Sequence, residues 1–207
     1  MSRAVRAFKK RGVERVLDLG CGSGGHLLYL AERGFEPHGI DISGEAIRTA
    51  RDLFKEKNLR ADLRVGNIFK KLPFERGYFD AVISTRALHH ARIGDIRRAI
   101  GEMARVLRPG GVIYVTVPRV KTTSRKRHRL IGPRTYVPVE GLEKGVVHYL
   151  FNKELVKREF RRFKRLGFWV ERGPEKWECY YCLLGSKELQ QGDLIAELAA
   201  LADRKTI

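Results

Sequence analysis

One glycine-rich segment constrains this chain more than any other. An apolar run through Val16, Leu17 and Leu19 stops at the glycines of residues 20–25, and an apolar helical spacing begins at Leu27. This order predicts a buried strand, a tight turn and the first turn of a helix. Glycine permits positive φ angles and close approach of a ligand, while the N–H groups at the start of a helix lack partners within it. The segment is therefore typical of a nucleotide-binding turn.

The glycine turn fits two kinds of nucleotide site. Gly20, Gly22 and Gly25 satisfy the G-x-G-x-x-G spacing of dinucleotide-binding enzymes. Asp18 followed by Gly20, Gly22 and Gly24 is a different pattern, in which a carboxylate suits a cationic ligand and would repel an adjacent pyrophosphate. This second pattern resembles the first motif of class I S-adenosylmethionine-dependent methyltransferases with a type 11-like domain, usually close to Asp-Leu-Gly-Cys-Gly-Ser-Gly. A nicotinamide-dependent oxidoreductase is the less favoured interpretation.

A second acidic residue stands at the end of the next predicted strand. Residues 36–40 are typical of a short strand, and Asp41 follows it 23 positions after Asp18. At about this spacing, a carboxylate can accept hydrogen bonds from both hydroxyls of a ribose. Asp41 or Ser43 could instead cap the helix predicted from Gly44. Both roles are compatible if Ser43 caps the helix and Asp41 binds the ribose.

Three later segments also resemble the methyltransferase family. Residues 79–84 form a predicted strand that matches the family's Phe-Asp-x-Val motif. Residues 107–111, Leu-Arg-Pro-Gly-Gly, predict a helix stop and a turn before a buried strand at 112–117, a feature that nicotinamide enzymes do not need. Asn67 follows a predicted strand at 61–65, at a corner where the family often has Asp or Asn near the adenine. The alternative for Asn67 is an ordinary turn asparagine.

The resemblance implies a fold, a cofactor and a set of contacts. The fold would be a Rossmann-like α/β domain: a seven-stranded, mostly parallel sheet with helices on both faces and an antiparallel last strand. Residues 1–186 would form this domain, with 118–150 as an insertion and candidate lid over the acceptor site, and 187–207 as a helical tail capable of self-association. The cofactor would be S-adenosylmethionine. Its expected contacts are Asp18, Gly20, Cys21, Gly22, Gly24, Asp41, Ile42, Asn67, Ile68 and Ser84.

His89 and His90 are the candidate catalytic residues. They follow the strand predicted at 79–84, at the sheet edge where ligands bind in α/β folds, and imidazole can accept a proton near neutral pH. In the resembled family a Leu-His-His run often shapes the cofactor pocket instead. No catalytic triad is expected, because the cofactor carries an activated methyl group and alignment of the acceptor supplies much of the rate.

The C-terminal half is less similar to the family. Asn152 is typical of a helix N-cap, and the apolar spacing after it predicts a helix to Leu166, ended by Gly167. Strands are expected at 168–172 and 176–184 as the closing hairpin. The resemblance also places Tyr136, His148 and Tyr149 near an acceptor pocket, and residues 2–11 have the pattern of a short basic helix.

The cysteines predict neither a disulfide framework nor a metal site. The chain has three, Cys21, Cys179 and Cys182, and a reducing cytoplasm is the expected location. Cys179 and Cys182 form a C-x-x-C pair, but residues three apart on a strand point to opposite faces. We therefore expect no metal. No segment has the ~20 apolar residues of a membrane span, and residues 1–10 lack a signal peptide's apolar run.

The charge of the chain leaves the methyl acceptor open. The formal net charge is +18, which favours an anionic partner such as RNA, although thermophile-like enrichment of surface charge is the alternative. Seven basic residues and no acidic one occupy 119–134: Arg119, Lys121, Arg125, Lys126, Arg127, Arg129 and Arg134. This segment could bind phosphate or form a solvated loop. The family favours a small-molecule acceptor, and a non-catalytic cofactor-binding module is the third hypothesis.

Overall fold

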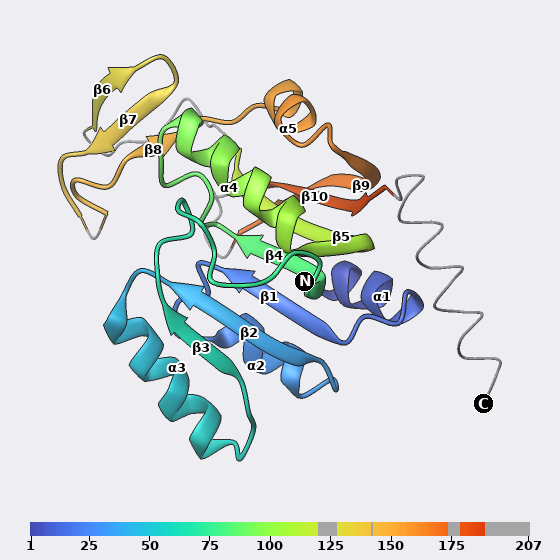
Figure 1. Ribbon diagram of the computed structural model, residues 1–207. Coiled ribbons are helices and arrows are strands. Elements are labelled where there is room, and N and C mark those ends of the chain that lie inside the picture. The colour runs from blue at the N-terminus through green and yellow to red at the C-terminus, as the bar shows by residue number, and fades with distance from the viewer. Residues whose placement is uncertain (120–127, 142, 174–178, 189–207) are drawn as a thin grey trace, which may run out of the picture.

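A seven-stranded sheet forms the centre of the molecule (Figure 1). The computed structural model describes residues 1–119, 128–141, 143–173 and 179–188. The strands lie in the order β3-β2-β1-β4-β5-β10-β9, and β10 is antiparallel to both of its neighbours. The predicted sheet is therefore confirmed. Its strands are β1 (Arg15–Leu19), β2 (Glu36–Asp41), β3 (Asp62–Val65), β4 (Phe79–Thr85), β5 (Leu107–Pro118), β9 (Phe163–Arg172) and β10 (Cys179–Lys187).

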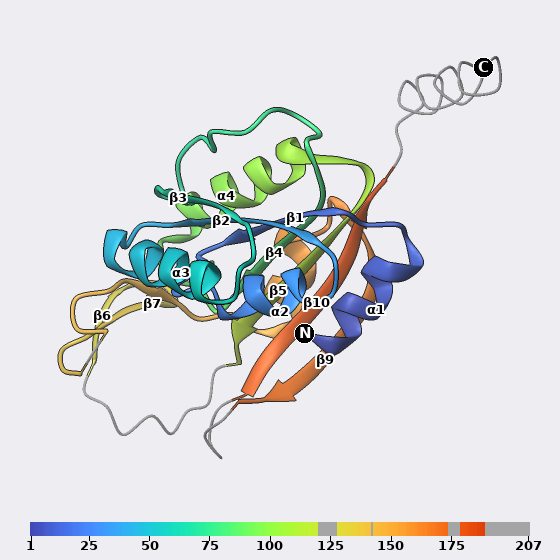
Figure 2. The same cartoon turned by 90° about the horizontal axis from the view of Figure 1, so that it is seen from below.

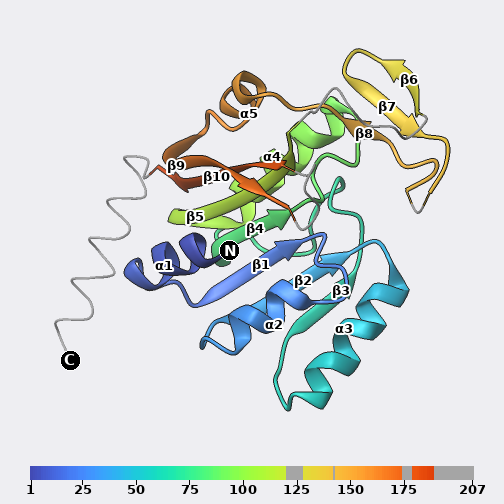
Figure 3. The same cartoon turned by 180° about the vertical axis from the view of Figure 1, so that it is seen from behind.

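Helices cover both faces of this sheet. One face carries α1 (Ser2–Lys10), α2 (Gly25–Ala31) and α3 (Gly44–Glu56), and the other carries α4 (Ile93–Val106) and α5 (Lys153–Glu159). Figures 2 and 3 show the two helical layers with the sheet between them. Among the described helices, none combines the length and the apolar character of a transmembrane segment.

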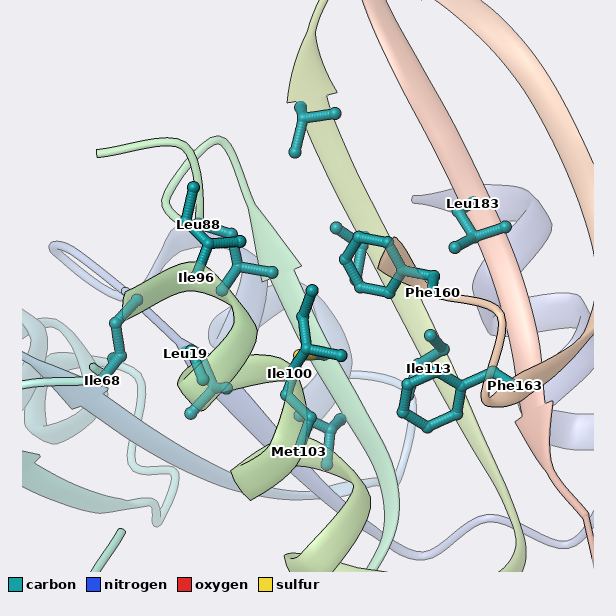
Figure 4. Packing of buried hydrophobic residues seen from close by; sticks show 14 of the residues in the cluster. Leu19, Ile68, Leu88, Ile96, Ile100, Met103, Ile113, Phe160, Phe163 and Leu183 are labelled. Carbon is teal, nitrogen blue, oxygen red and sulfur yellow. The ribbon is translucent and has the colours of Figure 1, made fainter. Parts of the chain in front are cut away.

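Successive side chains of each strand point to opposite faces of the sheet, and this alternation produces the two halves of the hydrophobic core. In β1, Leu17 and Leu19 pack on the face of α4, whereas Val16 packs toward α1. Figure 4 shows Leu19, Ile113 and residues of α4 in the first of these clusters. Each fully buried side chain of this size stabilises the fold by ~1.5–3 kcal/mol. This packing holds the ends of β1 and β4, which carry the candidate site, in fixed positions.

A buried carboxylate connects the starts of three parallel strands. Asp80 Oδ1 accepts a hydrogen bond from Arg108 Nε at 2.6 Å, and Oδ2 accepts from the backbone N–H groups of Glu14 and Arg15 at 3.0 and 2.8 Å. Burial raises the pKa of Asp80, but these hydrogen bonds outweigh it and hold the pKa below its ordinary value. The Phe-Asp-x-Val and Leu-Arg-Pro-Gly-Gly segments thus have a structural role here.

Described residues between His128 and Tyr149 form a small three-stranded antiparallel sheet beyond the carboxyl end of β4 (Figure 1). The backbone N–H of Tyr149 donates to the carbonyl of His89 at 2.8 Å, which attaches this sheet to the loop after β4. Its strands are β6 (His128–Gly132), β7 (Thr135–Pro138) and β8 (His148–Tyr149).

Two predictions in the C-terminal half are wrong. Asn152 does cap α5, accepting from the N–H of Leu155 at 2.8 Å, but the helix ends at Glu159 rather than at Leu166. From Phe163 the chain instead pairs with β10 along its whole length, and Gly167 lies inside β9 opposite Leu184. Inter-strand hydrogen bonds and burial of Phe163 therefore override a local pattern that also suits a helix.

The predicted closing strand and tail are only partly covered by the structure. Described residues of β10 extend from Cys179 to Lys187, so the strand ends later than the predicted Leu184. Both cysteines of the C-x-x-C pair are free, and only Cys182 is buried. The tail from 189 to 207, and residues 120–127 of the basic segment, lie outside the described residues.

Candidate functional site

The glycine turn after β1 has the backbone that its sequence predicts. Gly20, Gly22 and Gly24 have φ angles of +79°, +52° and +84°, and Gly24 is the residue before α2. A Cβ atom on Gly20 would overlap the side chain of Ala87, whereas no heavy atom lies within 4 Å of the corresponding position on Gly22. The turn is thus closely packed on one side and open on the other, where a ligand could approach.

Asp41 lies at the tip of β2, beside this turn. Its Oδ2 accepts a hydrogen bond from the N–H of Gly22 at 2.8 Å, and its Oδ1 accepts from the N–H of Ser43 at 2.9 Å. The Ser43 hydroxyl oxygen accepts from the N–H of Ala46 at 3.1 Å, so Ser43 is the cap of α3 as predicted. The helix cap therefore does not require Asp41, whose carboxylate faces the glycine turn.

Asp18 has a buried carboxyl group without a hydrogen-bond partner in the part of the chain that the structure describes. Its side chain is fully buried, and neither oxygen has a hydrogen-bond partner among the described residues. Burial, and then the charge of Asp41, raises the pKa of Asp18 to about 8. An unpaired buried carboxyl costs several kcal/mol if ionised, so a cation or hydrogen-bond donor at the turn would stabilise it. The residues present thus fit a cationic nucleoside, whereas a diphosphate would meet two carboxyl groups.

The other residues predicted to contact the cofactor differ in their burial and in their hydrogen bonds. Asn67 Oδ1 accepts from the N–H of Phe69 at 2.8 Å, and the Ser84 hydroxyl donates to the carbonyl of Leu19 at 2.8 Å, so both have structural hydrogen bonds. The Cys21 thiol and Ile68 are buried, and burial raises the pKa of that thiol. Ile42 is 71% exposed beside Asp41, which leaves an apolar surface next to the carboxylate.

A cavity of about 210 Å³ opens on the α2 side of the same sheet edge. His26 Nδ1 lies 2.7 Å from the hydroxyl of Thr85 in its wall, and Arg86 lines it with a φ of +58°. Glu171 and Tyr180, from β9 and β10, also contribute to the polar lining. Sequence reasoning did not single out His26, Thr85 or Arg86, because strands far apart in the chain bring these groups together.

His89 and His90 lie in a cluster that includes a third histidine, His148. The ring centroids are 3.9 Å apart for His89 and His90, and 4.8 Å apart for His90 and His148. Burial lowers the pKa of all three, to about 4 for His148, so the rings are neutral at pH 7. Tyr136 stacks on His148 with ring centroids 4.9 Å apart. Tyr149, another predicted pocket residue, is buried in the core against Phe151.

Comparison with known proteins agrees with this geometry. Residues 16–111 match the family described as a methyltransferase domain. The PH0226 protein from Pyrococcus horikoshii OT3 has the same fold, with a TM-score of 0.72, 26% identity, and coverage of 89% of this chain and 87% of that chain.

Two sequence relatives carry specific names. The chain is 35% identical over 147 residues to 24-methylenesterol C-methyltransferase 2 of Oryza sativa subsp. japonica, covering 69% of this chain and 38% of that protein. It is 31% identical over 108 residues to ribosomal RNA small subunit methyltransferase C of Alcanivorax borkumensis, covering 51% of this chain and 32% of that protein. The chain thus spans about a third of these relatives' lengths. Together with the strand order and the glycine turn, the match of residues 16–111 to a methyltransferase domain is consistent with a class I S-adenosylmethionine-dependent methyltransferase.

Proposed function

We propose that the chain binds S-adenosylmethionine at the glycine turn and transfers its methyl group to a nucleophilic acceptor. The carrying observation is the carboxyl group of Asp18, which is fully buried and has no hydrogen-bond partner among the described residues, together with Asp41, which accepts a hydrogen bond from the N–H of Gly22 in the glycine turn. When bound, the cofactor supplies a sulfonium-activated methyl group. The cationic amino acid end of this ligand suits Asp18, directly or through water, and the vicinal ribose hydroxyls suit Asp41.

The remaining residues of the site orient and cover the ligand in this proposal. Gly20, Gly22 and Gly24 give the backbone its positive φ angles and leave room for the nucleoside. The exposed side chain of Ile42 offers an apolar surface to the adenine, and Asn67 and Ile68 lie at the next strand tip. Because methyl transfer to an aligned nucleophile is an in-line displacement, the protein's main contribution is orientation, which can be worth ~7–11 kcal/mol.

Replacement of Asp41 by alanine tests the ribose contact. We expect Asp41→Ala to weaken binding of S-adenosylhomocysteine at least tenfold, because two charge-assisted hydrogen bonds are lost. Isothermal titration calorimetry measures the affinity, and thermal unfolding confirms that the domain is folded. Ser43→Ala is the matched control: it removes the cap of α3, costing ~1 kcal/mol of stability, without removing the carboxylate. Unchanged affinity in Asp41→Ala would remove Asp41 from the site.

We propose a small molecule as the acceptor class. The sterol methyltransferase among the relatives supports this choice, as does the open, partly polar cavity near Thr85 and Arg86. The absence of an Asn/Asp-Pro-Pro-Tyr segment after β4 argues against the exocyclic nitrogen of a base as the acceptor atom. A chain that binds the cofactor but methylates no acceptor would instead be a non-catalytic binding module.

RNA is the second candidate acceptor, supported by the net charge of +18 and by the ribosomal RNA methyltransferase relative. Arg119 and Arg134 are exposed at the two ends of the basic segment. If RNA is bound there, its affinity should fall by ~10³–10⁵ between about 50 and 200 mM salt for 6–10 phosphate contacts. Gel-shift or fluorescence titration measures this slope. Absent or salt-insensitive RNA binding would leave the small molecule as the acceptor.

A charge-neutralised variant localises any RNA binding. We replace Lys121, Arg125, Lys126 and Arg127 with glutamine. The plot of log affinity against log salt concentration should then become less steep, by about the contribution of four released counterions. The matched control replaces four exposed basic residues on or near α3, far along the sheet: Arg48, Lys55, Lys57 and Arg60. Equal effects of the two variants would indicate nonspecific attraction, and would contradict a role for the basic segment.

A further inference from the structure

Three histidines from two separate parts of the fold converge at the edge of the sheet. His89 and His90 belong to the loop after β4, and His148 is the first residue of β8 in the small sheet. One ring nitrogen from each of them lies within 4.8 Å of the other two. His89 and His148 are 5% and 3% exposed, respectively. The cluster is therefore built into the junction between the small sheet and the central sheet.

These rings carry nitrogens that lack hydrogen-bond partners. Among the residues that the structure describes, no group bonds to His89 Nδ1, His90 Nε2 or His148 Nε2, and all three atoms are buried. A buried nitrogen without a partner costs ~1–3 kcal/mol. A metal ion that accepts lone pairs from the three neighbouring rings would remove such a cost.

A carboxylate lies beside the same point. Glu143 Oε1 is 3.5 Å from His90 Nε2, and Glu143 Oε2 is 3.6 Å from His148 Nε2, too long or poorly aligned for hydrogen bonds. Its side chain is 56% exposed, so it closes the cluster on the solvent side. Three imidazoles and one carboxylate are a donor set that zinc and its neighbouring transition metals accept.

We propose that His89, His90 and His148 bind a divalent transition-metal ion of the Zn²⁺ type, with Glu143 as the fourth ligand. Zinc–nitrogen bonds of ~2.0–2.1 Å place two ligands of a tetrahedral ion ~3.4 Å apart. The ring nitrogens, at most 4.8 Å apart, would have to move closer together to reach this spacing. The bound ion would fasten the small sheet to the loop after β4. The metal site would use His89 and His90, which are also the candidate catalytic residues, so the two roles are alternatives for these side chains; the test of metal binding does not depend on methyl transfer.

Metal titration of the full chain, free of any histidine tag and stripped with a chelator, tests the proposal. We expect one equivalent of Zn²⁺ to bind, and Co²⁺ used as a probe to give the visible absorption of a tetrahedral site. Bound Zn²⁺ should also raise the midpoint of thermal unfolding, because it binds the folded state alone. Failure of the wild-type chain to bind either ion would overturn the proposal, whatever its methyltransferase activity.

Variants distinguish this site from adventitious binding to a histidine-containing protein. His148→Ala should weaken Zn²⁺ binding at least 100-fold and abolish the Co²⁺ spectrum. Glu143→Gln keeps an exposed side chain of the same size, so it should fold normally and weaken binding about tenfold. His38→Gln is the matched control, since His38 is buried elsewhere and pairs with Glu36 at 2.9 Å. Equal Zn²⁺ affinity in wild type, His148→Ala and Glu143→Gln would overturn the proposal.

Discussion

Replacement of Gly20 with alanine is expected to lower the free energy of unfolding by about 3 kcal/mol. The added methyl group would overlap the side chain of Ala87, and the backbone at Gly20 has a φ of +79°, which costs an L-residue ~1 kcal/mol by itself. Chemical denaturation measures the change, and the midpoint of thermal unfolding should fall by roughly 6–12 °C for a chain of this size.

Two further variants distinguish the loss of stability caused by steric overlap with Ala87 from the loss caused by backbone strain at Gly20. Gly12→Ala is the matched control, because Gly12 has a φ of +58° and no heavy atom within 4 Å of the added Cβ, so only the ~1 kcal/mol strain should appear. Adding Ala87→Gly to Gly20→Ala should restore most of the excess loss by removing the overlapping atom. Equal destabilisation by Gly20→Ala and Gly12→Ala would show that the turn is not packed against Ala87.

Binding of S-adenosylhomocysteine is expected to strengthen with pH between about 6 and 8, by up to tenfold per unit. In the unliganded protein, burial and the charge of Asp41 raise the pKa of Asp18 to about 8, so the carboxyl is protonated at pH 7. The ligand's ammonium group favours the ionised carboxylate, and binding therefore releases a proton. Calorimetry in buffers of different ionisation enthalpy counts that proton directly.

The same pKa shift has an opposite consequence for the unliganded fold. Because the folded protein retains on Asp18 a proton that the unfolded chain loses above its ordinary pKa of 3.8, stability from this group falls as the pH rises from about 4 to 8. Asp18→Asn is the control for both effects. Asparagine cannot ionise, so any pH dependence that remains in this variant comes from the ligand's own amino group. A wild-type affinity that varies with pH no more than that of Asp18→Asn would contradict a role for Asp18 in binding.

Local patterns predicted the cofactor half of the fold well. The strand that ends at Leu19, the glycine turn and the Ser43 cap all depend on residues close together in sequence, where backbone preference and burial agree. The parallel order of these strands was implied by the resemblance to the family. The end of α5 was mispredicted because Phe160 and Phe163 fit a helix locally, while pairing with β10, which is distant in the chain, decides the structure.

The histidine cluster shows a different limit of sequence reasoning. His89 and His90 were singled out as proton acceptors, but no local pattern connects them to His148, 58 residues after His90, which only the family resemblance placed near an acceptor pocket. Their convergence depends on how the small sheet packs on the loop after β4, and on the contact between the Tyr149 N–H and the His89 carbonyl. Asp18 is comparable: its position in the motif was predicted, but its complete burial without a partner is a property of the packed structure.

A crystal structure of the chain with S-adenosylhomocysteine tests the central claim most directly. The account predicts the nucleoside over Gly20–Gly24, its ribose hydroxyls on the carboxylate of Asp41 and its amino group on the side of Asp18. Soaking the same crystals with NAD should leave the turn without a bound diphosphate. An S-adenosylhomocysteine molecule bound elsewhere, or a diphosphate seated on the glycine turn, would contradict the account.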